Sequence, residues 1–283
     1  MSSPSAPPAE PAHPPVRRIP NLGHAALLCL LYLAGLACAV IAIVLVVVLH
    51  LFGIATDADA RHSIVVALGS TAINYVVTLG AGALVFSIFW RNGVLAALQW
   101  NASAVRRFWW LLLAVAAASF GLNLLLSRVL HFPANTPMSD LLTTPQAWWI
   151  MFAFGVTLGP FAEEIIFRGF LLPAFATAWD WTGEKLSHHS PRPLGPNNHP
   201  RWSLAAMIFG SLLASFFFAL AHASQNGWAW GPIVAVSAGS LILCAVRLVS
   251  RSLAASTFTH IAYNFTLFTV TLIRTHGFHN LHH

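Results

Sequence analysis

The chain has 283 residues, of which 57% are hydrophobic and only 8% are charged. Soluble domains carry about 25% charged residues, so this composition excludes an ordinary soluble protein and indicates an integral membrane protein. The formal net charge of +6 does not indicate nucleic-acid binding, because the basic residues lie mostly in the segments between apolar runs.

Seven apolar runs follow one another along the chain, most of them close to the roughly 20 residues that a helix needs to cross a bilayer. They span residues 25–52, 63–90, 108–127, 148–178, 203–223, 232–249 and 253–273. These runs are too long and too unbroken for the strands of a membrane barrel. The predicted fold class is therefore all-α, a polytopic bundle of transmembrane helices.

One polytopic domain with two terminal tails is predicted. Residues 1–22, rich in Pro, Ser and Ala, are predicted to be a disordered cytoplasmic tail. Residues 23–147 hold the N-terminal transmembrane helices, residues 148–273 the core with the polar motifs, and residues 274–283 a polar, His-rich tail. We expect this last tail to be exposed. A metal site there is the alternative, although a tail without fixed geometry makes a poor site.

The basic residues also predict an orientation. With the runs threaded in order, ten Lys and Arg fall on the side of the N-terminus and three on the other side. This positive-inside bias predicts a cytoplasmic N-terminus, and the short loops suggest the cytoplasmic membrane of a bacterium. Two segments on the inner side stand out. Residues 91–107 are predicted as a short interfacial helix or a plain loop, and residues 179–202 as a polar loop.

The stretch FAEEIIFRGF, residues 161–170, places three charged side chains inside the fourth apolar run. Each costs about 2.5–3.5 kcal/mol or more at a bilayer centre, so a function is expected. Glu164 and Arg168 are four residues apart and form the natural ion pair on one helical face. Glu163 then points elsewhere and is a candidate general base for water. The alternative is a structural ion cluster that fixes helix register. Pro160 is expected to disturb the helix just before the carboxylates.

Two later runs carry polar residues at helical spacing. His222 follows Phe218 by four residues, and Asn264 follows His260 by four. A lone histidine in a span is often satisfied by a carbonyl, but together with Glu163 this set can activate water and stabilise an oxyanion. The depths differ: His260 lies about 10 Å past the start of its run, and His222 near the far end of its own. They meet only if the helices are tilted, offset or broken.

Three motifs in this order resemble those of one family. EEIIFRG at 163–169 resembles an EExxxR motif, FALAH at 218–222 an FxxxH motif and HIAYN at 260–264 an HxxxN motif. Residues 148–268 thus resemble the CPBP family of intramembrane proteases (CAAX protease and bacteriocin-processing, or Abi), including type II CAAX prenyl endopeptidases. Members have about eight spans, so about 7–8 are expected. The resemblance implies hydrolysis of a peptide bond within the membrane.

The resemblance also implies roles. Glu163 would activate water with help from His222, while His260 and Asn264 would hold the oxyanion. Glu164, Arg168 and Phe218 would support the site. No cofactor is favoured. A metalloprotease is the alternative, with zinc held by Glu163, His222 and His260, ligand types that a catalytic zinc site accepts.

The expected partners are the lipid bilayer and a peptide or protein substrate, of the prenylated CAAX type by resemblance, and not nucleic acid. The oligomeric state is not predicted. Two other functions stay open. The charged cluster would serve a proton- or ion-coupled transporter as a relay, and a catalytically silent scaffold or immunity factor would use the same groove to hold membrane peptides.

Overall fold

The computed structural model describes residues 18–90, 93–195 and 199–280, and within these residues it is all-helical. The predicted all-α fold is confirmed. The longer elements are α1 (Leu22–Val48), α3 (Ile64–Phe89), α5 (Ala102–Val129), α7 (Pro145–Gly155), α8 (Leu158–Glu164), the π-helix η2 (Ile165–Leu171), α9 (Leu172–Leu186), α10 (Leu204–Ala221), α11 (Trp230–Ser250) and α12 (Leu253–Arg274). Short helices connect them: η1 (Leu51–Gly53), α2 (Asp57–Arg61), α4 (Val94–Ala97), α6 (Pro137–Leu141) and η4 (Ser224–Asn226).

Six helices of the described residues are long and apolar enough to cross a membrane. One of them is the stretch Pro145–Leu186, 42 residues that comprise α7, α8, η2 and α9. The seventh predicted span is α12, which forms a 22-residue helix but is not among the six. Its many threonines, with His260 and Asn264, make it less apolar than the others.

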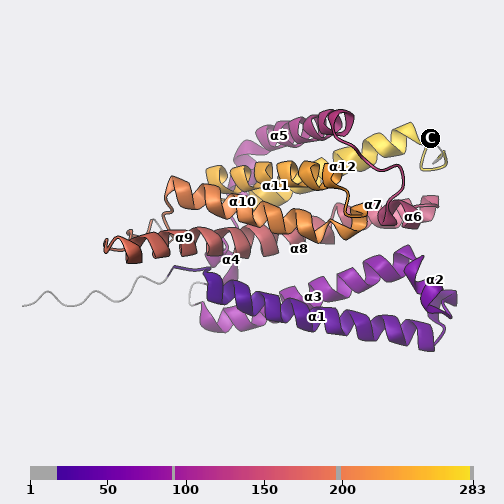
Figure 1. Cartoon of the computed structure of the whole chain (residues 1–283), viewed down its shortest axis with the longest axis horizontal. Coiled ribbons are helices and arrows are strands. Elements are labelled where there is room, and N and C mark those ends of the chain that lie inside the picture. The colour runs from indigo at the N-terminus through magenta and orange to yellow at the C-terminus, as the bar shows by residue number, and fades with distance from the viewer. Residues whose placement is uncertain (1–17, 91–92, 196–198, 281–283) are drawn as a thin grey trace, which may run out of the picture.

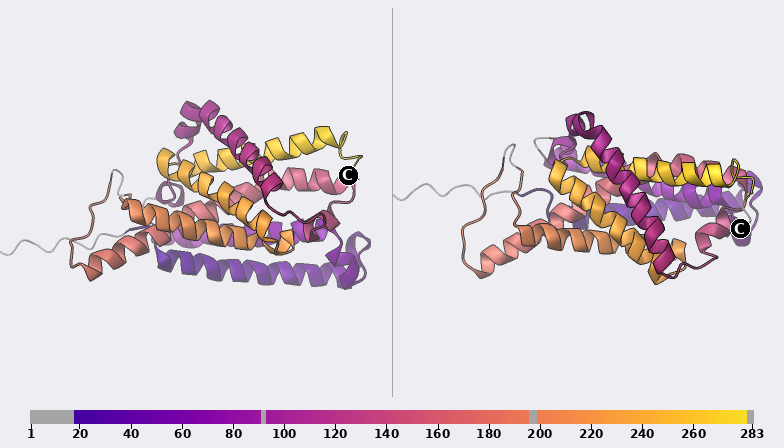
Figure 2. Two further views of the ribbon diagram at one scale, coloured as in Figure 1. Left: turned by 45° about the horizontal axis from the view of Figure 1, so that its top comes forward. Right: turned by 90° about the horizontal axis from the view of Figure 1, so that it is seen from above.

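The helices lie in layers along one long axis (Figure 1). Helices α1 and α3 pack against each other as a pair on one side of the molecule, while α5 packs on α12 and α11 on the other. The stretch from α8 to α9 and helix α10 lie between these groups, and Figure 2 shows the same order from two further directions. The carboxylate-bearing stretch is therefore central in the bundle.

A small residue sets the contact between α1 and α3. A Cβ on Gly35 would lie 2.8 Å from both the Asn74 carbonyl oxygen and Thr78 Oγ1, so only glycine allows this approach. Asn74 and Thr78 are buried and hydrogen-bonded to each other at 3.1 Å. This contact fixes which face of α3 is turned towards α1 and which towards the rest of the bundle.

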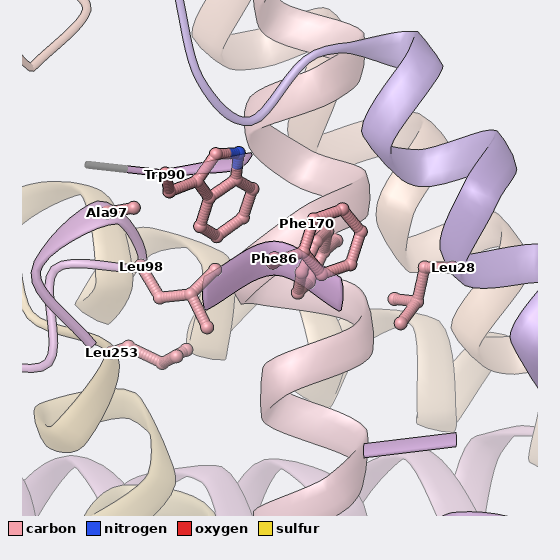
Figure 3. Packing of buried hydrophobic residues seen from close by; sticks show 7 residues of the cluster. All are labelled: Leu28, Phe86, Trp90, Ala97, Leu98, Phe170 and Leu253. Atoms are coloured by element: carbon pink, nitrogen blue, oxygen red, sulfur yellow. The ribbon is translucent and has the colours of Figure 1, made fainter. Parts of the chain in front are cut away.

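An apolar cluster joins the two groups of helices near one end (Figure 3). Its buried members are Leu28, Phe86, Trp90, Ala97, Leu98, Phe170 and Leu253. Phe86, Trp90 and Phe170 pack with ring centroids 4.7–5.5 Å apart, Trp90 stacked on both phenylalanines. The cluster places Leu253, the first residue of α12, beside Phe170 of η2.

Helix α10 begins at a different level from α12, because its N-cap is bound further along the same central stretch. The backbone N–H of Ser203 donates to Asp180 Oδ2 at 2.8 Å. Asp180 is ten residues after Phe170, an offset of about 15 Å at 1.5 Å per residue. His222, 19 residues past Ser203, therefore reaches about the same depth as His260, seven past Leu253. The depth mismatch in the sequence is resolved by this offset.

One expectation for the inner-side segments is corrected. Helix α9 continues to Leu186, so the predicted 179–202 loop starts later, after the α9 turn that carries Asp180 and Glu184. Of residues 91–107, α4 covers only Val94–Ala97 and α5 already begins at Ala102. A short helix and a loop therefore fill this segment, within the two alternatives expected. The Gln99 carbonyl accepts from the Leu253 N–H and the Asn101 carbonyl from the Ser252 hydroxyl, which ties the loop to the start of α12.

The two tails also differ in part from expectation. Residues 1–17 of the predicted 1–22 tail lie outside the described residues, but Arg18 is ordered and pairs with Glu184 at 2.7 Å. Within the described part of the 274–283 tail, Phe278 is fully buried and stacks on Trp148 at 5.3 Å. The tail was expected to be exposed. Its described part docks because Phe278 packs against Trp148 and Trp149.

Candidate active site

The central stretch is interrupted just before the carboxylates. Helix α7 ends with Val156 as its C-cap, and Thr157 has a non-helical backbone (φ −128°, ψ −94°). Helix α8 restarts at Leu158, which puts Pro160 in its first turn. The first four N–H groups of a helix have no intrahelical partner, so the missing N–H of a proline costs little there. The disturbance expected from Pro160 is thus a break between α7 and α8. The break leaves carbonyl oxygens near Gly155 without helical hydrogen-bond partners.

Glu164 and Arg168 form the predicted ion pair. Arg168 Nη1 lies 2.9 Å from Glu164 Oε1, and both side chains are fully buried. Arg168 Nη2 also donates to the Ser240 hydroxyl at 2.7 Å and to its carbonyl at 3.1 Å, which joins η2 to α11. With Glu164 committed to this pair, Glu163 is the carboxylate left to face the centre of the bundle.

Phe218, predicted to support the site, touches three of its members. The Arg168 guanidinium lies over its ring, 4.5 Å from the centroid. The rings of His222 and His260 lie 4.5 Å and 6.0 Å from it. A buried aromatic face in this position keeps water from the ion pair and limits the orientations of both imidazoles.

The two histidines face Glu163 from opposite sides. His222 Nε2 lies 3.9 Å from Glu163 Oε1, and His260 Nε2 lies 3.8 Å from Glu163 Oε2. The other ring nitrogens are engaged: His222 Nδ1 lies 2.8 Å from the Phe218 carbonyl, and His260 Nδ1 lies 3.0 Å from Glu164 Oε1. A carbonyl only accepts, so the Nδ1 of His222 carries the hydrogen, and its Nε2 is free to accept a proton when the ring is neutral.

Asn264 lies on the same wall as His260 but has a partner of its own. Its Nδ2 donates to the Gly155 carbonyl at 2.7 Å, across the break before α8. The amide therefore satisfies a carbonyl that the break has freed, a contact that spacing alone could not indicate. An amide nitrogen carries two hydrogens, so one N–H remains for another acceptor.

All four predicted catalytic residues line one cavity of about 260 Å³, together with side chains from both groups of helices. Glu163 enters from α8, His222 from the end of α10, and His260 and Asn264 from α12. The wall is otherwise largely apolar, with Leu68, Met138, Met151, Phe154, Val236, Leu243, Leu267 and Phe268 among its members. The structure thus brings Glu163, His222, His260 and Asn264 together, as expected for a shared site.

One cavity residue in contact with Glu163 was missed by the motifs. The Tyr75 hydroxyl of α3 donates to Glu163 Oε1 at 3.4 Å. Tyr75 belongs to the N-terminal helices, where the sequence offers no partner at a fixed spacing. A tyrosine in the middle of an apolar run was the only available signal.

A metal site is a separate question. Two imidazoles and a carboxylate are ligand types that zinc accepts, and the contact between His260 and Glu164 is the kind that orients a metal-bound histidine. Within the described ranges, however, no group of three or more His, Cys, Asp or Glu side chains is arranged to hold a metal ion. In the zinc alternative Glu163 would be the central ligand, because His222 Nε2 and His260 Nε2 lie 3.9 Å and 3.8 Å from its two oxygens.

Comparison with known proteins identifies one family whose model matches part of the chain. Residues 145–266 match the family model described as type II CAAX prenyl endopeptidase Rce1-like. The match begins at the first residue of α7 and includes Glu163, His222, His260 and Asn264, but not Tyr75. No match was found among curated proteins or among solved structures.

Proposed function

Because residues 145–266 belong to the Rce1-like family of type II CAAX prenyl endopeptidases, we propose that this protein is an intramembrane endopeptidase with Glu163 as its base. The observation that supports the proposal is that the two neighbouring carboxylates have different partners. Glu164 is bound to Arg168, while Glu163 faces two imidazoles in a cavity. A carboxylate held in this way is placed to take a proton from water.

The charges of the cluster balance if His260 is protonated. Glu164 and Arg168 neutralise each other at 2.9 Å. His260 lies between Glu164 and Glu163, with one ring nitrogen towards each. An imidazolium there would neutralise the Glu163 carboxylate, so that no net charge is buried. In this state His260 presents an Nε2–H to the cavity.

The first chemical step is attack by water. The 3.9 Å between Glu163 Oε1 and His222 Nε2 is a gap that one water can bridge with two hydrogen bonds of about 2.8 Å. Glu163 takes a proton from this water as its oxygen bonds to the carbonyl carbon of the substrate. Neutral His222 accepts the second hydrogen bond and keeps the water oriented.

The second step breaks the peptide bond. The tetrahedral intermediate places its negative oxygen near the Nε2–H of His260 and the free N–H of Asn264, which stabilise it as an oxyanion hole does. The C–N bond then breaks, and the proton held by Glu163 passes to the leaving nitrogen. The products are a carboxylic acid and an amine, the acid passes its proton to the amine or to water on release, and Glu163 returns to its carboxylate form. No step passes through a metal.

The substrate is proposed to be a membrane-associated peptide of the prenylated CAAX type, as the family's description indicates. The largely apolar cavity wall suits such a substrate. We further propose that the protein lies in a bacterial cytoplasmic membrane with its N-terminus in the cytoplasm, from its charge distribution.

The test compares Glu163→Gln with wild type in liposomes, using a quenched fluorescent CAAX peptide with and without a prenyl group. Glutamine keeps the shape but takes no proton from water, so we expect binding to persist and turnover to fall by about 10³ or more. Glu184→Gln is the matched control, because Glu184 lies in the same helical stretch but pairs with Arg18. If the Glu163→Gln enzyme is active, the cluster of Glu163, Glu164 and Arg168 is structural and Glu163 is not the base.

A further inference from the structure

Tyr75 contacts the proposed base from a helix that the family match does not cover. Its hydroxyl donates to Glu163 Oε1 at 3.4 Å, across 88 residues of chain. The bond is long, as hydrogen bonds of ligand-free catalytic sites often are. The nearest ring nitrogens of His222 and His260 lie 3.9 Å and 3.8 Å from Glu163, beyond hydrogen-bond distance. Among the described residues, Tyr75 therefore supplies the one side-chain hydrogen bond that Glu163 accepts.

The position of the Tyr75 hydroxyl is fixed by packing on two sides. The phenol ring stacks on Phe154 of α7, with centroids 6.3 Å apart and an interplanar angle of 19°. On the adjoining face of α3, Asn74 and Thr78 are held against Gly35 of α1. The close packing of α1 and α3 thus sets the rotation of α3 that aims Tyr75 at the cavity.

We propose that Tyr75 is a positioning residue for Glu163, an inference that rests on the proposed function of that carboxylate. The hydroxyl holds Oε1 at the side of the cavity that His222 faces, which leaves Oε2 towards His260. The N-terminal helices then belong to the active site.

The other charged or titratable groups near Glu163 are His222 of α10, His260 of α12 and the ion pair of Glu164 with Arg168. None of them is altered by Tyr75→Phe, which removes only the hydroxyl and keeps the ring on Phe154. A change in the Glu163 carboxylate or in turnover in this variant is therefore attributable to the lost hydrogen bond.

The direct test needs no catalytic activity. The carboxylate stretching bands of Glu163, obtained from the infrared difference between each protein and the same protein carrying Glu163→Gln, report which hydrogen bonds its two oxygens accept. We expect these bands to shift in Tyr75→Phe, because Oε1 loses its donor. Tyr263→Phe is the matched control, because Tyr263 lines the same cavity and has no hydrogen bond to Glu163.

Peptide hydrolysis gives the second readout. Tyr75→Phe should lower kcat about tenfold with little change in KM and leave the unfolding temperature unchanged. Carboxylate bands that coincide for wild type and Tyr75→Phe would overturn the inference, and so would a loss of activity that follows a lower unfolding temperature. Because the infrared measurement does not depend on turnover, an inactive wild type would contradict the protease function and not the role of Tyr75.

Discussion

Arg168 and Glu164 form an ion pair 2.9 Å long between two side chains without solvent exposure. Removing one member of such a pair strands the other as an uncompensated buried charge, at about 3–5 kcal/mol. We expect Arg168→Leu to lower the yield of folded protein and its unfolding temperature in detergent. Substrate binding should fall in proportion to the loss of folded protein.

Arg168→Lys is the informative companion to this variant. Lysine keeps a positive charge near Glu164 but loses the flat guanidinium that lies over Phe218 and the donor to the Ser240 hydroxyl. We expect a stability between those of wild type and Arg168→Leu. If Arg168→Leu were as stable as wild type, the pair would not hold α8 and η2 in place.

Sequence and structure agree where a relation depends on helical spacing within one element. The pairing of Glu164 with Arg168, and the resulting freedom of Glu163, follow from a separation of four residues and one residue on a helix. Phe218 with His222, and His260 with Asn264, share faces for the same reason. These are local relations, and no tertiary contact had to be known.

The remaining geometry depends on contacts between distant segments. The common depth of His222 and His260 follows from the anchoring of α10 at Asp180 and of α12 near Phe170. The bond from Asn264 to Gly155 depends on a helix break whose exact backbone the sequence does not specify. Tyr75 reaches the site only because α3 packs beside α7 and α8. The spacing of residues along the sequence does not indicate such contacts between distant segments.

Asn264 is predicted to act in both folding and chemistry. Asn264→Ala removes the hydrogen bond from the amide to the Gly155 carbonyl. Leaving that carbonyl unpaired should cost about 1–3 kcal/mol. If the second N–H holds the oxyanion, kcat should also fall by about 10²–10³. Thermal unfolding and single-turnover hydrolysis on the same preparation separate the two effects.

Thr266→Ala is the control for Asn264→Ala, because its hydroxyl only bonds to the Ala262 carbonyl of the same helix. It should leave stability and turnover near wild type. A loss of turnover in Asn264→Ala that matches only the loss of folded protein would make Asn264 purely structural.

Gly35 tests whether the packing of α1 on α3 is needed. The Cβ of Gly35→Ala would approach the Asn74 carbonyl oxygen at 2.8 Å, so the two helices must move apart. We expect a lower unfolding temperature and, because α3 carries Tyr75, reduced turnover. Gly80→Ala on α3 is the control, since a Cβ there meets no atom within 4 Å. Equal behaviour of the two variants would show that the close approach is not needed.

The last prediction concerns metal. In the proposed mechanism Glu163 acts as a base and not as a ligand, so purified wild-type protein should contain no stoichiometric zinc by elemental analysis. Its hydrolysis of the CAAX peptide should survive prolonged incubation with 1,10-phenanthroline. If Glu163, His222 and His260 instead hold zinc, chelation should abolish activity and added zinc should restore it. Glu163→Gln should then also bind less metal than wild type, because a lost ligand weakens the site.

His199→Ala serves as the control in both assays, since His199 is not among the residues that line the cavity, and it should match wild type throughout. Activity that falls with zinc content would replace the metal-free mechanism, while the positions of the four residues in the cavity would be unaffected.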